Sequence, residues 1–323
     1  MSDKITWGIL GCARIARRGL IPGIQGSRLG RLEAIASRDA DAARSWAAEF
    51  SIPRSYGSYA ELLADKSIRA VYIPLPNELH RPWTLAAAAA GKHVLCDKPL
   101  ALDAREAEEM VDGCRRGGVL LMEGFMWRHH PRTTRVLELI RDGAIGELRL
   151  VRSSFSFDID RTDWRLDAAR GGGALWDVGC YGVNACRLIC GGEPTSIRAR
   201  ARWWPTGVDM TLAATLEFTG GVLGQVDCSF EVPYRCQMEI VGTRGAIELP
   251  QAYVPGDAAE IILRAGESVE RVAVPAANQY GAMVDHFCEA MLADRPLPPP
   301  AEDGRLNVRV LDAVLAAARS AAP

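Results

Sequence analysis

Two short segments contain residue types that together can carry out hydride-transfer chemistry. One is Cys96-Asp97-Lys98-Pro99, and the other runs from Gly171 to Tyr181 with the sequence GGGALWDVGCY. Moving a hydride to or from a carbonyl carbon requires a group that handles the proton on the oxygen, and a tyrosine assisted by a lysine can do so. Lys98, Tyr181 and Asp177 are therefore the candidate catalytic residues.

The tyrosine and the aspartate are predicted to project from one face of a helix. We expect this helix from about Ala174 to Ile189, with residues 171–173 as a flexible entry, and residues four apart lie on the same side of a helix. The alternative is a buried tyrosine on a helix face whose hydroxyl is bonded to Asp177.

The lysine is predicted to follow the fourth strand of a parallel sheet. Pro99 restricts Lys98 to extended or bridge-like conformations, and ligands gather at the carboxyl ends of parallel strands. An ammonium there stabilises a phenolate or alkoxide and lowers the pKa of a neighbouring tyrosine. The alternative is a surface lysine in a solvent-facing turn.

The elements that must position these groups alternate between short apolar runs and helical stretches over residues 1–124. Such alternation predicts a doubly wound, Rossmann-type α/β domain with a parallel sheet that binds a dinucleotide. The expected strands are Ile5–Leu10, Leu32–Ala36, Ala70–Pro74, His93–Cys96 and Val119–Met122, and the expected helices lie near Arg14–Gly26, Asp41–Phe50, Tyr59–Asp65, Arg81–Ala90 and Arg105–Arg116.

The first predicted strand ends in a variant of the G-x-G-x-x-A fingerprint. Gly11, Ala13, Arg14 and Ile15 belong to it, with alanine at the second small position. Small residues let the backbone approach a pyrophosphate, which then lies over a helix N-terminus. A tight strand-to-helix turn also packs small residues for its own reasons, and this is the alternative interpretation.

The second predicted strand ends at Ser37-Arg38-Asp39, which bears on the choice of cofactor. NAD-specific folds usually place an acidic residue at this strand end, whereas a small hydroxyl followed by arginine suits a 2′-phosphate. Ser37 and Arg38 therefore favour NADP(H) over NAD(H). In the alternative, Arg38 is a solvated loop cation and Asp39 binds the ribose.

Residues 125–323 are predicted to form an α+β domain around a large, open, mainly antiparallel sheet that binds substrate. The closing helices are expected at Asn278–Leu292 and Arg305–Ala318. An open sheet with apolar residues on both faces must cover one face with helices and the other with a partner, so we expect a homodimer or higher homo-oligomer through this sheet. The expected strands are Glu147–Asp158, Ile197–Trp204, Met210–Phe218, Gly221–Phe230, Cys236–Val241, Gly245–Leu249 and Glu260–Ala265.

These motifs, in this order, resemble the Gfo/Idh/MocA oxidoreductases, and most closely the branch with dimeric dihydrodiol dehydrogenase, 1,5-anhydrofructose reductase and NADP-dependent D-xylose dehydrogenases. The family's usual E-K-P is here D-K-P, with an acid one methylene shorter. The segments that carry the resemblance are 11–16, 76–80 (PNELH), 90–100 (AGKHVLCDKPL), 122–128 (MEGFMWR), 163–165 (DWR) and 171–181.

The resemblance implies roles for these positions. Tyr181 would be the general acid or base, and Asp177 would orient the substrate or Lys98, whose bond to Pro99 is often cis in the family. His80 would lie on the nicotinamide side or, alternatively, cap the helix that follows it. The remaining residues implied to contact the cofactor are Leu75, Asn77, Asp97 and Glu123, together with Trp164, Arg165 and Tyr280 reaching in from the second domain.

The function implied is that of an NADP(H)-dependent oxidoreductase. It would move a hydride between nicotinamide and the hydroxyl or carbonyl carbon of a small-molecule substrate, namely a sugar, polyol or dihydrodiol. Some relatives are NAD(P)-dependent glycosidases that oxidise and re-reduce their sugar with no net redox change, and this is the alternative function.

Composition excludes other classes of function. The 323 residues have a formal net charge of −2, so nothing indicates a nucleic-acid partner. No run approaches the roughly 20 apolar residues of a membrane span, and we expect a cytoplasmic protein without a membrane partner. The nine cysteines are odd in number and include no C-x-x-C pair, which indicates reduced thiols packed as small hydrophobes and no metal site.

Overall fold

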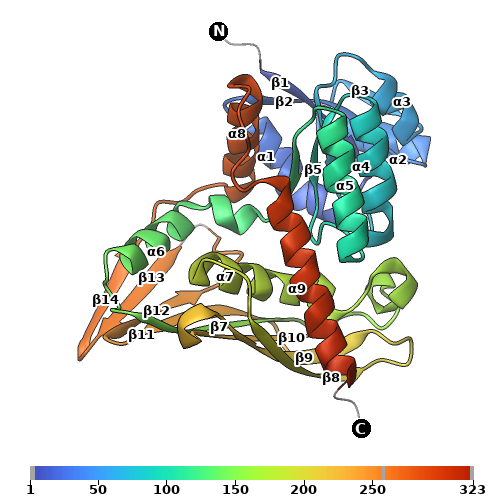
Figure 1. The fold of residues 1–323 in the computed structure, drawn as a ribbon. Helices are drawn as coiled ribbons and strands as arrows, with labels where there is room; N and C mark the ends of the chain where they lie inside the picture. The colour runs from blue at the N-terminus through green and yellow to red at the C-terminus, as the bar shows by residue number, and fades with distance from the viewer. Residues whose placement is uncertain (1–3, 257–258, 321–323) are drawn as a thin grey trace. The chain divides into compact units, whose positions relative to one another are not determined.

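The computed structural model describes residues 4–256 and 259–320 and divides into two compact units. The first unit consists of the residues up to His129 together with Asn278–Arg305. The second consists of His130–Ala277 and the residues from Leu306 onward. Each unit is described by itself (Figure 1).

A six-stranded sheet forms the centre of the first unit, in the order β3-β2-β1-β4-β5-β6. All neighbours are parallel, which confirms the predicted Rossmann arrangement, and the strand order reverses between β1 and β4. The helices α4 and α5 lie on one side of the sheet and α1 and α8 on the other (Figure 1). The strands are β1 Ile5–Leu10, β2 Gly30–Ala36, β3 Arg54–Tyr56, β4 Ala70–Ile73, β5 His93–Cys96 and β6 Leu121–Glu123, and the helices are α1 Ile21–Gln25, α2 Ala40–Glu49, α3 Tyr59–Ala64, α4 His80–Ala89, α5 Ala104–Arg116 and α8 Gln279–Leu292.

The helix α8 belongs to the first unit, although the sequence places it in the predicted domain 125–323. The Trp7 indole nitrogen of β1 donates to Cys288 Sγ at 3.4 Å, and the Trp7 and Phe287 rings lie 5.4 Å apart. Asp285 accepts hydrogen bonds from the Ser27 hydroxyl and the Leu29 backbone nitrogen. The division of the chain therefore differs from the predicted one because an amphipathic helix returns to cover the first sheet.

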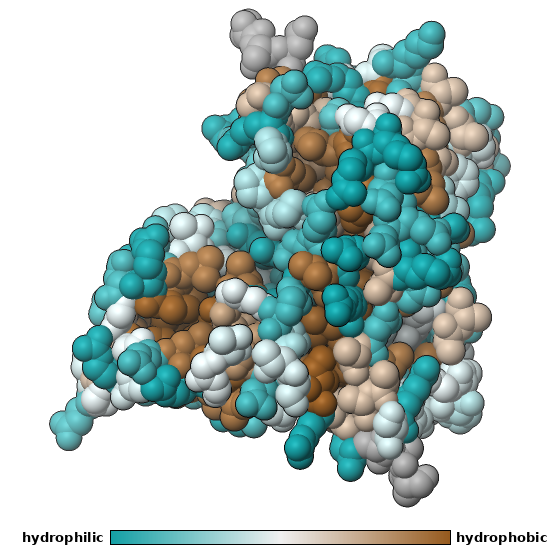
Figure 2. Space-filling view, in the orientation of Figure 1, coloured by the Kyte–Doolittle hydropathy of each residue, from teal (hydrophilic) through white to brown (hydrophobic). Residues whose placement is uncertain are grey.

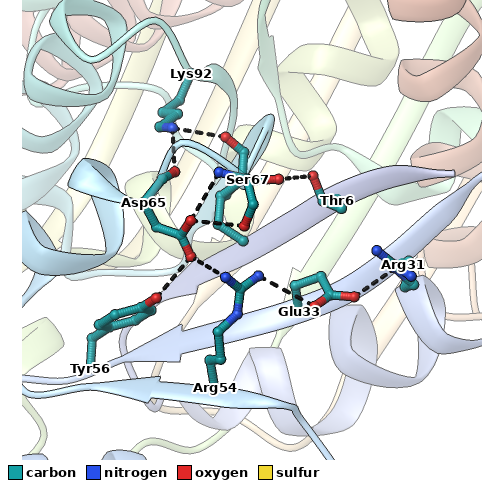
Figure 3. Close-up of polar contacts among 9 residues, drawn as sticks. Thr6, Arg31, Glu33, Arg54, Tyr56, Asp65, Ser67 and Lys92 are labelled. Atoms are coloured by element: carbon teal, nitrogen blue, oxygen red, sulfur yellow. Dashed lines mark hydrogen bonds and ion pairs between the residues drawn. The ribbon is translucent and has the colours of Figure 1, made fainter. Parts of the chain in front are cut away.

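A polar network joins the strands of the first unit at the edge where they begin (Figure 3). Asp65 accepts hydrogen bonds from the Ser67 hydroxyl at 2.8 Å and the Tyr56 hydroxyl at 2.8 Å, and it pairs with Arg54. The buried Lys92 ammonium donates to the carbonyl oxygens of Asp65 and Ile68 at 2.7 and 2.8 Å. These contacts hold the short β3 strand, which the sequence analysis did not predict, against its neighbours.

The second unit is built on an eight-stranded sheet in the order β14-β13-β12-β11-β7-β10-β9-β8. Its neighbours are antiparallel except for β7 and β10, which run parallel, so the predicted mainly antiparallel sheet is confirmed. The strands are β7 Leu148–Ser156, β8 Ser196–Trp203, β9 Asp209–Glu217, β10 Leu223–Ser229, β11 Arg235–Gly242, β12 Gly245–Pro250, β13 Glu260–Ala265 and β14 Ser268–Ala273, and the helices are α6 Pro131–Arg141, α7 Cys180–Cys190 and α9 Ala301–Ser320, whose first residues belong to the first unit.

The two faces of this sheet differ in polarity. On one face α7 packs closely, because a Cβ added at Gly182 would lie 2.7 Å from Val226 Cγ1 and 3.0 Å from Ser153 Oγ. The other face carries charged side chains such as Arg198, Arg235 and Glu239, on strands whose residues alternate between buried and exposed. The expectation of apolar residues on both faces is therefore wrong.

The visible surface is mostly hydrophilic, and apolar side chains reach it in the second unit around α6 and β13 (Figure 2). Val254 and Val269 are among the exposed apolar side chains of this unit. Among the described helices, none has the length and apolar character needed to cross a membrane.

Candidate active site

The candidate cofactor residues of the first unit lie at the carboxyl ends of five different strands. Gly11 follows β1, Ser37 follows β2, Leu75 lies just beyond β4, Lys98 follows β5 and Glu123 ends β6. Because these strands are parallel, their carboxyl ends share one edge of the sheet, the edge at which this fold binds dinucleotides. The fold thus brings together residues that are up to 112 positions apart.

The fingerprint loop requires glycine at its first position. Gly11 has φ +114°, and an added Cβ would lie 2.7 Å from Leu75 Cδ2 and 3.6 Å from the Tyr59 hydroxyl. The Tyr59 ring packs edge-on against Trp83 at 4.8 Å, and its hydroxyl forms a hydrogen bond with Arg38. Tyr59 is a further candidate site residue that no sequence pattern indicates, because nothing in its local sequence links it to a loop 48 positions earlier.

The strand end that bears on cofactor choice presents an exposed arginine. Asp39 Oδ1 accepts hydrogen bonds from the backbone nitrogens of Asp41 at 2.9 Å and Ala42 at 3.1 Å, which makes Asp39 the N-cap of α2. The Ser37 hydroxyl accepts the Asp39 nitrogen at 3.1 Å. Asp39 therefore caps the helix through Oδ1, and Arg38 and Asp39 are both exposed at this strand end.

His80 links two loops at this edge. Its ring is buried, with Nδ1 2.9 Å from the Pro99 carbonyl oxygen and Nε2 2.8 Å from the Leu75 carbonyl oxygen. Burial lowers the pKa of this imidazole, while the nearby Asp97 raises it. Both ring nitrogens thus face carbonyl oxygens of other segments and do not cap the start of α4. His80 therefore supports the segment that follows Lys98. The peptide bond between Lys98 and Pro99 is cis.

Two carboxylates support the same segment. Burial raises the pKa of Asp97, while Lys98, His80 and a hydrogen bond from the Tyr72 hydroxyl lower it. Glu123 Oε1 accepts the Leu100 backbone nitrogen at 2.9 Å. The predicted cofactor contacts Asp97 and Glu123 therefore also hold the backbone around the lysine.

Two further predicted contacts lie in the first unit. Asn77 is buried and begins the short helical turn Asn77–Leu79. Tyr280 lies on α8, and Cβ atoms added at Gly19 or Gly23 would come within 2.5 and 2.7 Å of its side chain. The expectation that Tyr280 reaches in from the second domain is wrong, because α8 packs within the first unit.

In the second unit, Tyr181 lies on α7 against an aromatic cluster. Its ring centroid is 5.4 Å from that of Phe155 and 4.9 Å from that of Tyr253, and its side chain is 6% exposed. The Tyr253 hydroxyl is hydrogen bonded to Ser153 Oγ at 2.6 Å. The cluster fixes the plane of the Tyr181 ring, and Tyr253, 72 positions away in sequence, had no signal that would have identified it.

Asp177 forms an ion pair with a predicted cofactor contact. Arg165 Nε lies 3.1 Å from Asp177 Oδ2, and the Arg165 guanidinium also pairs with Asp163 at 3.2 Å. The two carboxylates raise the pKa of Arg165, and Asp177 has the larger effect. The guanidinium groups of Arg165 and Arg170 each lie 5.0 Å from the Trp164 ring, so Trp164 and Arg165 form one structure with the helix that carries Asp177.

The glycine run before this helix is tightly packed, which corrects the expectation of a flexible entry. A Cβ at Gly172 would lie 2.2 Å from the Arg165 carbonyl oxygen, and one at Gly173, whose φ is +115°, would lie 2.3 Å from Asp209 Oδ1. The run leads into a π-helical turn at Leu175–Gly179 and then into α7. Such turns are frequent at functional sites.

The cysteines and histidines form no metal centre in the part of the chain that the structure describes. There, no three side chains of the metal-ligating types are grouped to hold an ion. All nine cysteines are free thiols, and burial raises the pKa of Cys190 to about 12. The cysteines near Tyr181 therefore pack as small apolar groups.

Known families match both units of the chain. The description "Oxidoreductase family, NAD-binding Rossmann fold" matches residues 5–125, and "GFO/IDH/MocA C-terminal domain" matches residues 133–248. The chain belongs to the GFO/IDH/MocA family of oxidoreductases. The family resemblance stated from the motifs is thereby confirmed, as is the prediction of a nicotinamide-dependent oxidoreductase.

Individual relatives match over almost their entire lengths. A D-xylose 1-dehydrogenase (NADP(+)) from Haloferax volcanii is 38% identical, with 98% of each chain covered. A 3-ketoreductase from Actinomadura kijaniata, solved with NADP and TDP-benzene, is 32% identical with a TM-score of 0.91 and 98% of each chain covered. An aldose-aldose oxidoreductase from Caulobacter crescentus, solved with glycerol, is 30% identical with a TM-score of 0.92 and 99% of each chain covered.

Proposed function

We propose that this oxidoreductase uses NADP(H) and moves a hydride between the nicotinamide and a hydroxyl or keto carbon of a sugar or sugar-like molecule. The proposal is supported by similarity to a xylose dehydrogenase named for NADP(+) and to a 3-ketoreductase solved with NADP. The substrate class follows from these relatives, whose names refer to sugars and sugar nucleotides.

The observation that carries the cofactor preference is the use of Asp39 as a helix cap. Two backbone nitrogens of α2 donate to Asp39 Oδ1, which orients this carboxylate toward the helix, whereas the neighbouring Arg38 is exposed and available to a 2′-phosphate. An arginine at this position pairs with a 2′-phosphate through charge-assisted hydrogen bonds. NADP(H) has that phosphate and NAD(H) lacks it.

This preference is tested by titrating the Arg38→Ala variant with NADPH and with NADH. We expect the Kd for NADPH to rise about 10- to 100-fold, as loss of a charged hydrogen-bonding partner predicts, and the Kd for NADH to change little. Arg44→Ala is the matched control, since Arg44 is an exposed arginine of α2 paired with Asp41. Equal weakening of both cofactors by Arg38→Ala would refute the preference.

The residues of the first unit fit a dinucleotide. The backbone conformation of Gly11 leaves no side chain over the loop, and the helical turns that follow it offer backbone nitrogens to a pyrophosphate. When bound, the nicotinamide supplies or accepts the hydride. In our proposal Tyr181 donates or removes the proton of the reacting oxygen, Lys98 stabilises negative charge on that oxygen, and Asp177, fixed by Arg165, orients the substrate.

A screen of aldoses, keto sugars and polyols, followed at the nicotinamide absorbance in both directions, tests the reaction itself. Net, stoichiometric formation or consumption of NADPH is the expected result. An enzyme of the glycosidase type, or one that returns the hydride to a second sugar, would transform its substrate without net change in NADPH. That outcome, with labelled hydride retained in the product, would replace the proposed reaction.

A further inference from the structure

A buried carboxylate contacts the start of the helix that carries Asp177 and Tyr181. Asp209 is the first residue of β9 and is only 1% exposed. Its Oδ2 accepts the backbone nitrogen of Leu175 at 2.7 Å. Leu175 begins the π-helical turn that leads into α7, so this bond satisfies one of the backbone donors that every helix start leaves without a partner.

The second oxygen of the same carboxylate is fitted against Gly173. A Cβ at Gly173 would lie 2.3 Å from Asp209 Oδ1, so no other residue type fits there. The Gly173 carbonyl oxygen in turn accepts a hydrogen bond from the Asp177 backbone nitrogen at 3.1 Å. The Gly173 backbone nitrogen donates a hydrogen bond to the Arg165 carbonyl oxygen at 2.9 Å. Asp209 therefore lies at the point where the Arg165 loop and the Asp177 turn are joined.

The far end of α7 is held independently. The buried Arg187 guanidinium pairs with Glu193 at 2.7 Å and donates to Asn307 Oδ1 at 3.3 Å. The last turn of α7 thus has polar contacts of its own. Asp209 provides the polar contact at the other end, at the start of the π-helical turn that leads into α7.

Burial and the neighbouring groups act on the charge of Asp209 in opposite directions. Burial raises the pKa of this carboxyl to about 7, opposed by its hydrogen bond from Leu175 and by the charge of Arg319 on α9. The Cys228 thiol of β10 also faces Asp209, and burial raises the pKa of that thiol. A negative charge at this place is favoured by the partial positive charge of a helix start.

We propose that Asp209 is a positioning residue for the reaction, because its carboxylate sets the place of the helical turn that bears Asp177 and, through α7, of Tyr181. This inference rests on the proposed function, since it assumes that Asp177 and Tyr181 serve catalysis. Asp209 acts through them and contacts no reacting atom in the proposal.

The experiment compares Asp209→Ala, Asp209→Asn and the control Asp103→Asn in the full-length protein. Asp103 also caps a helix, accepting the Glu106 nitrogen at 2.7 Å, but its helix α5 lies in the first unit. We expect Asp209→Ala to lower kcat about 10- to 100-fold, as a displaced catalytic group predicts, with the Kd for NADPH unchanged. Asp209→Asn keeps an oxygen for the Leu175 nitrogen but carries no charge, so it is expected to restore kcat only to the lower level that the wild type has when Asp209 is protonated.

Two readouts separate positioning from a general loss of structure. Hydrogen exchange measured by mass spectrometry should become faster in peptides spanning 171–181 of Asp209→Ala and stay unchanged in peptides spanning 104–116. In addition, kcat of the wild type should rise as the pH rises through about 7, because the ionised carboxylate holds the Leu175 nitrogen more strongly than the neutral acid does, and Asp209→Asn should lose that inflection.

Distinct results overturn the inference and the function on which it rests. If Asp209→Ala exchanges faster at 171–181 but keeps its full kcat, Asp209 has no positioning role. If Asp209→Asn is as impaired as Asp209→Ala and exchanges like the wild type, the bond to Leu175 is not the cause and the inference fails. If Tyr181→Phe retains wild-type turnover, the proposed function fails instead. Should Asp209→Ala not fold, the pH profile and exchange of Asp209→Asn decide the matter.

Discussion

At the scale of single residues, the sharpest prediction concerns the Tyr181 hydroxyl. Removing it in Tyr181→Phe should lower kcat by about 10²- to 10⁴-fold, the usual worth of general acid–base catalysis, while the Kd for NADPH stays constant. The aromatic cluster that holds the ring has no need of the hydroxyl, so the ring should keep its place. Steady-state kinetics and fluorescence titration with NADPH measure the two quantities.

Tyr234→Phe is the matched control for this substitution. Tyr234 is 52% exposed and donates its hydroxyl hydrogen to Gln251 Oε1 at 3.0 Å, so losing that hydroxyl should leave turnover unchanged. If both variants lose turnover equally, or neither does, Tyr181 is not the proton-transfer group.

Sequence reasoning can propose a role for residues that stand in a contiguous motif. Gly11, Lys98, Asp177 and Tyr181 stand in short runs whose residue types and order already indicate chemistry. Asp209 belongs to no such run, and its relation to the glycine run depends on a fold that brings residues 173 and 209 together. For the same reason no sequence pattern indicates Tyr59 as a neighbour of the fingerprint loop. The PNELH segment indicates His80, but it does not indicate the two carbonyl oxygens that the His80 ring contacts.

At the scale of elements, the local sequence pattern predicts the buried apolar strands but not the short or exposed ones. The bounds predicted for β1 and β5 agree with the structure, because these are buried apolar runs with clear breaks on both sides. The three residues of β3 are held by charged side chains, and β14 (SVERVA) is an almost fully exposed edge strand, so neither is a buried apolar run. Tertiary contacts, which sequence does not display, decide such elements.

The network around Asp65 gives a prediction for the elements that it joins. Burial raises the pKa of this carboxyl, but hydrogen bonds from Ser67 and Tyr56 and the charge of Arg54 outweigh it and lower the pKa to about 2 from 3.8. A lowered folded-state pKa contributes stability above pH 3.8 that is lost as the pH falls toward 2. Asp65→Asn should therefore cost about 1–2 kcal/mol at pH 7 and less at pH 3, as measured by urea unfolding.

Asp112→Asn provides the comparison for that measurement. Asp112 forms an exposed ion pair with Arg115 on α5, which is expected to contribute less than about 0.5 kcal/mol. A loss of stability in Asp65→Asn that is no larger than in Asp112→Asn, or that does not shrink on acidification, would show that the network is not stabilising.

The contribution of Asp209, which contacts the start of the Leu175 turn, to stability has the opposite dependence on pH. Because burial raises its folded-state pKa to about 7, the ionised carboxyl costs stability that grows as the pH rises from 3.8 to about 7 and is constant above. Asp209→Asn cannot ionise, so its Tm relative to the wild type should rise by a few °C, roughly 2–4 °C per kcal/mol, between pH 5 and pH 8. Thermal unfolding at both values checks this, and a difference in Tm that is independent of pH would mean that Asp209 titrates normally.

At the scale of the whole molecule, two domains are predicted because short strands alternating with helices give way, near residue 125, to strands with alternating apolar and polar residues. The structure divides the chain at His129, close to that change, but returns Asn278–Arg305 to the first unit. A change of pattern reports where a parallel sheet gives way to an antiparallel one. It carries no information on which sheet a later helix covers, and α8 covers the first because Trp7, Ser27 and Leu29 provide partners there.

The open face of the second sheet leads to a prediction about assembly. It holds a groove of about 870 Å³ whose lining mixes both signs of charge, including the cross-strand pairs Arg152–Glu239 and Arg235–Asp227. A two-fold axis brings a face against its own copy, and a face carrying both signs can offer each charge an opposite partner. We therefore propose a homodimer through this face, held by polar contacts rather than the apolar surface first expected.

Light scattering at micromolar concentration should give twice the 35.0 kDa mass of the chain. Ala213 is exposed on this face between Arg200 and Asp227, and Ala213→Arg should yield the monomer because a long side chain there holds a partner sheet away. Ala89→Arg, at the exposed end of α4, adds the same side chain to the first unit and should leave the mass unchanged. A wild-type monomer would refute the dimer, and a dimer retained by Ala213→Arg would place the interface on another surface.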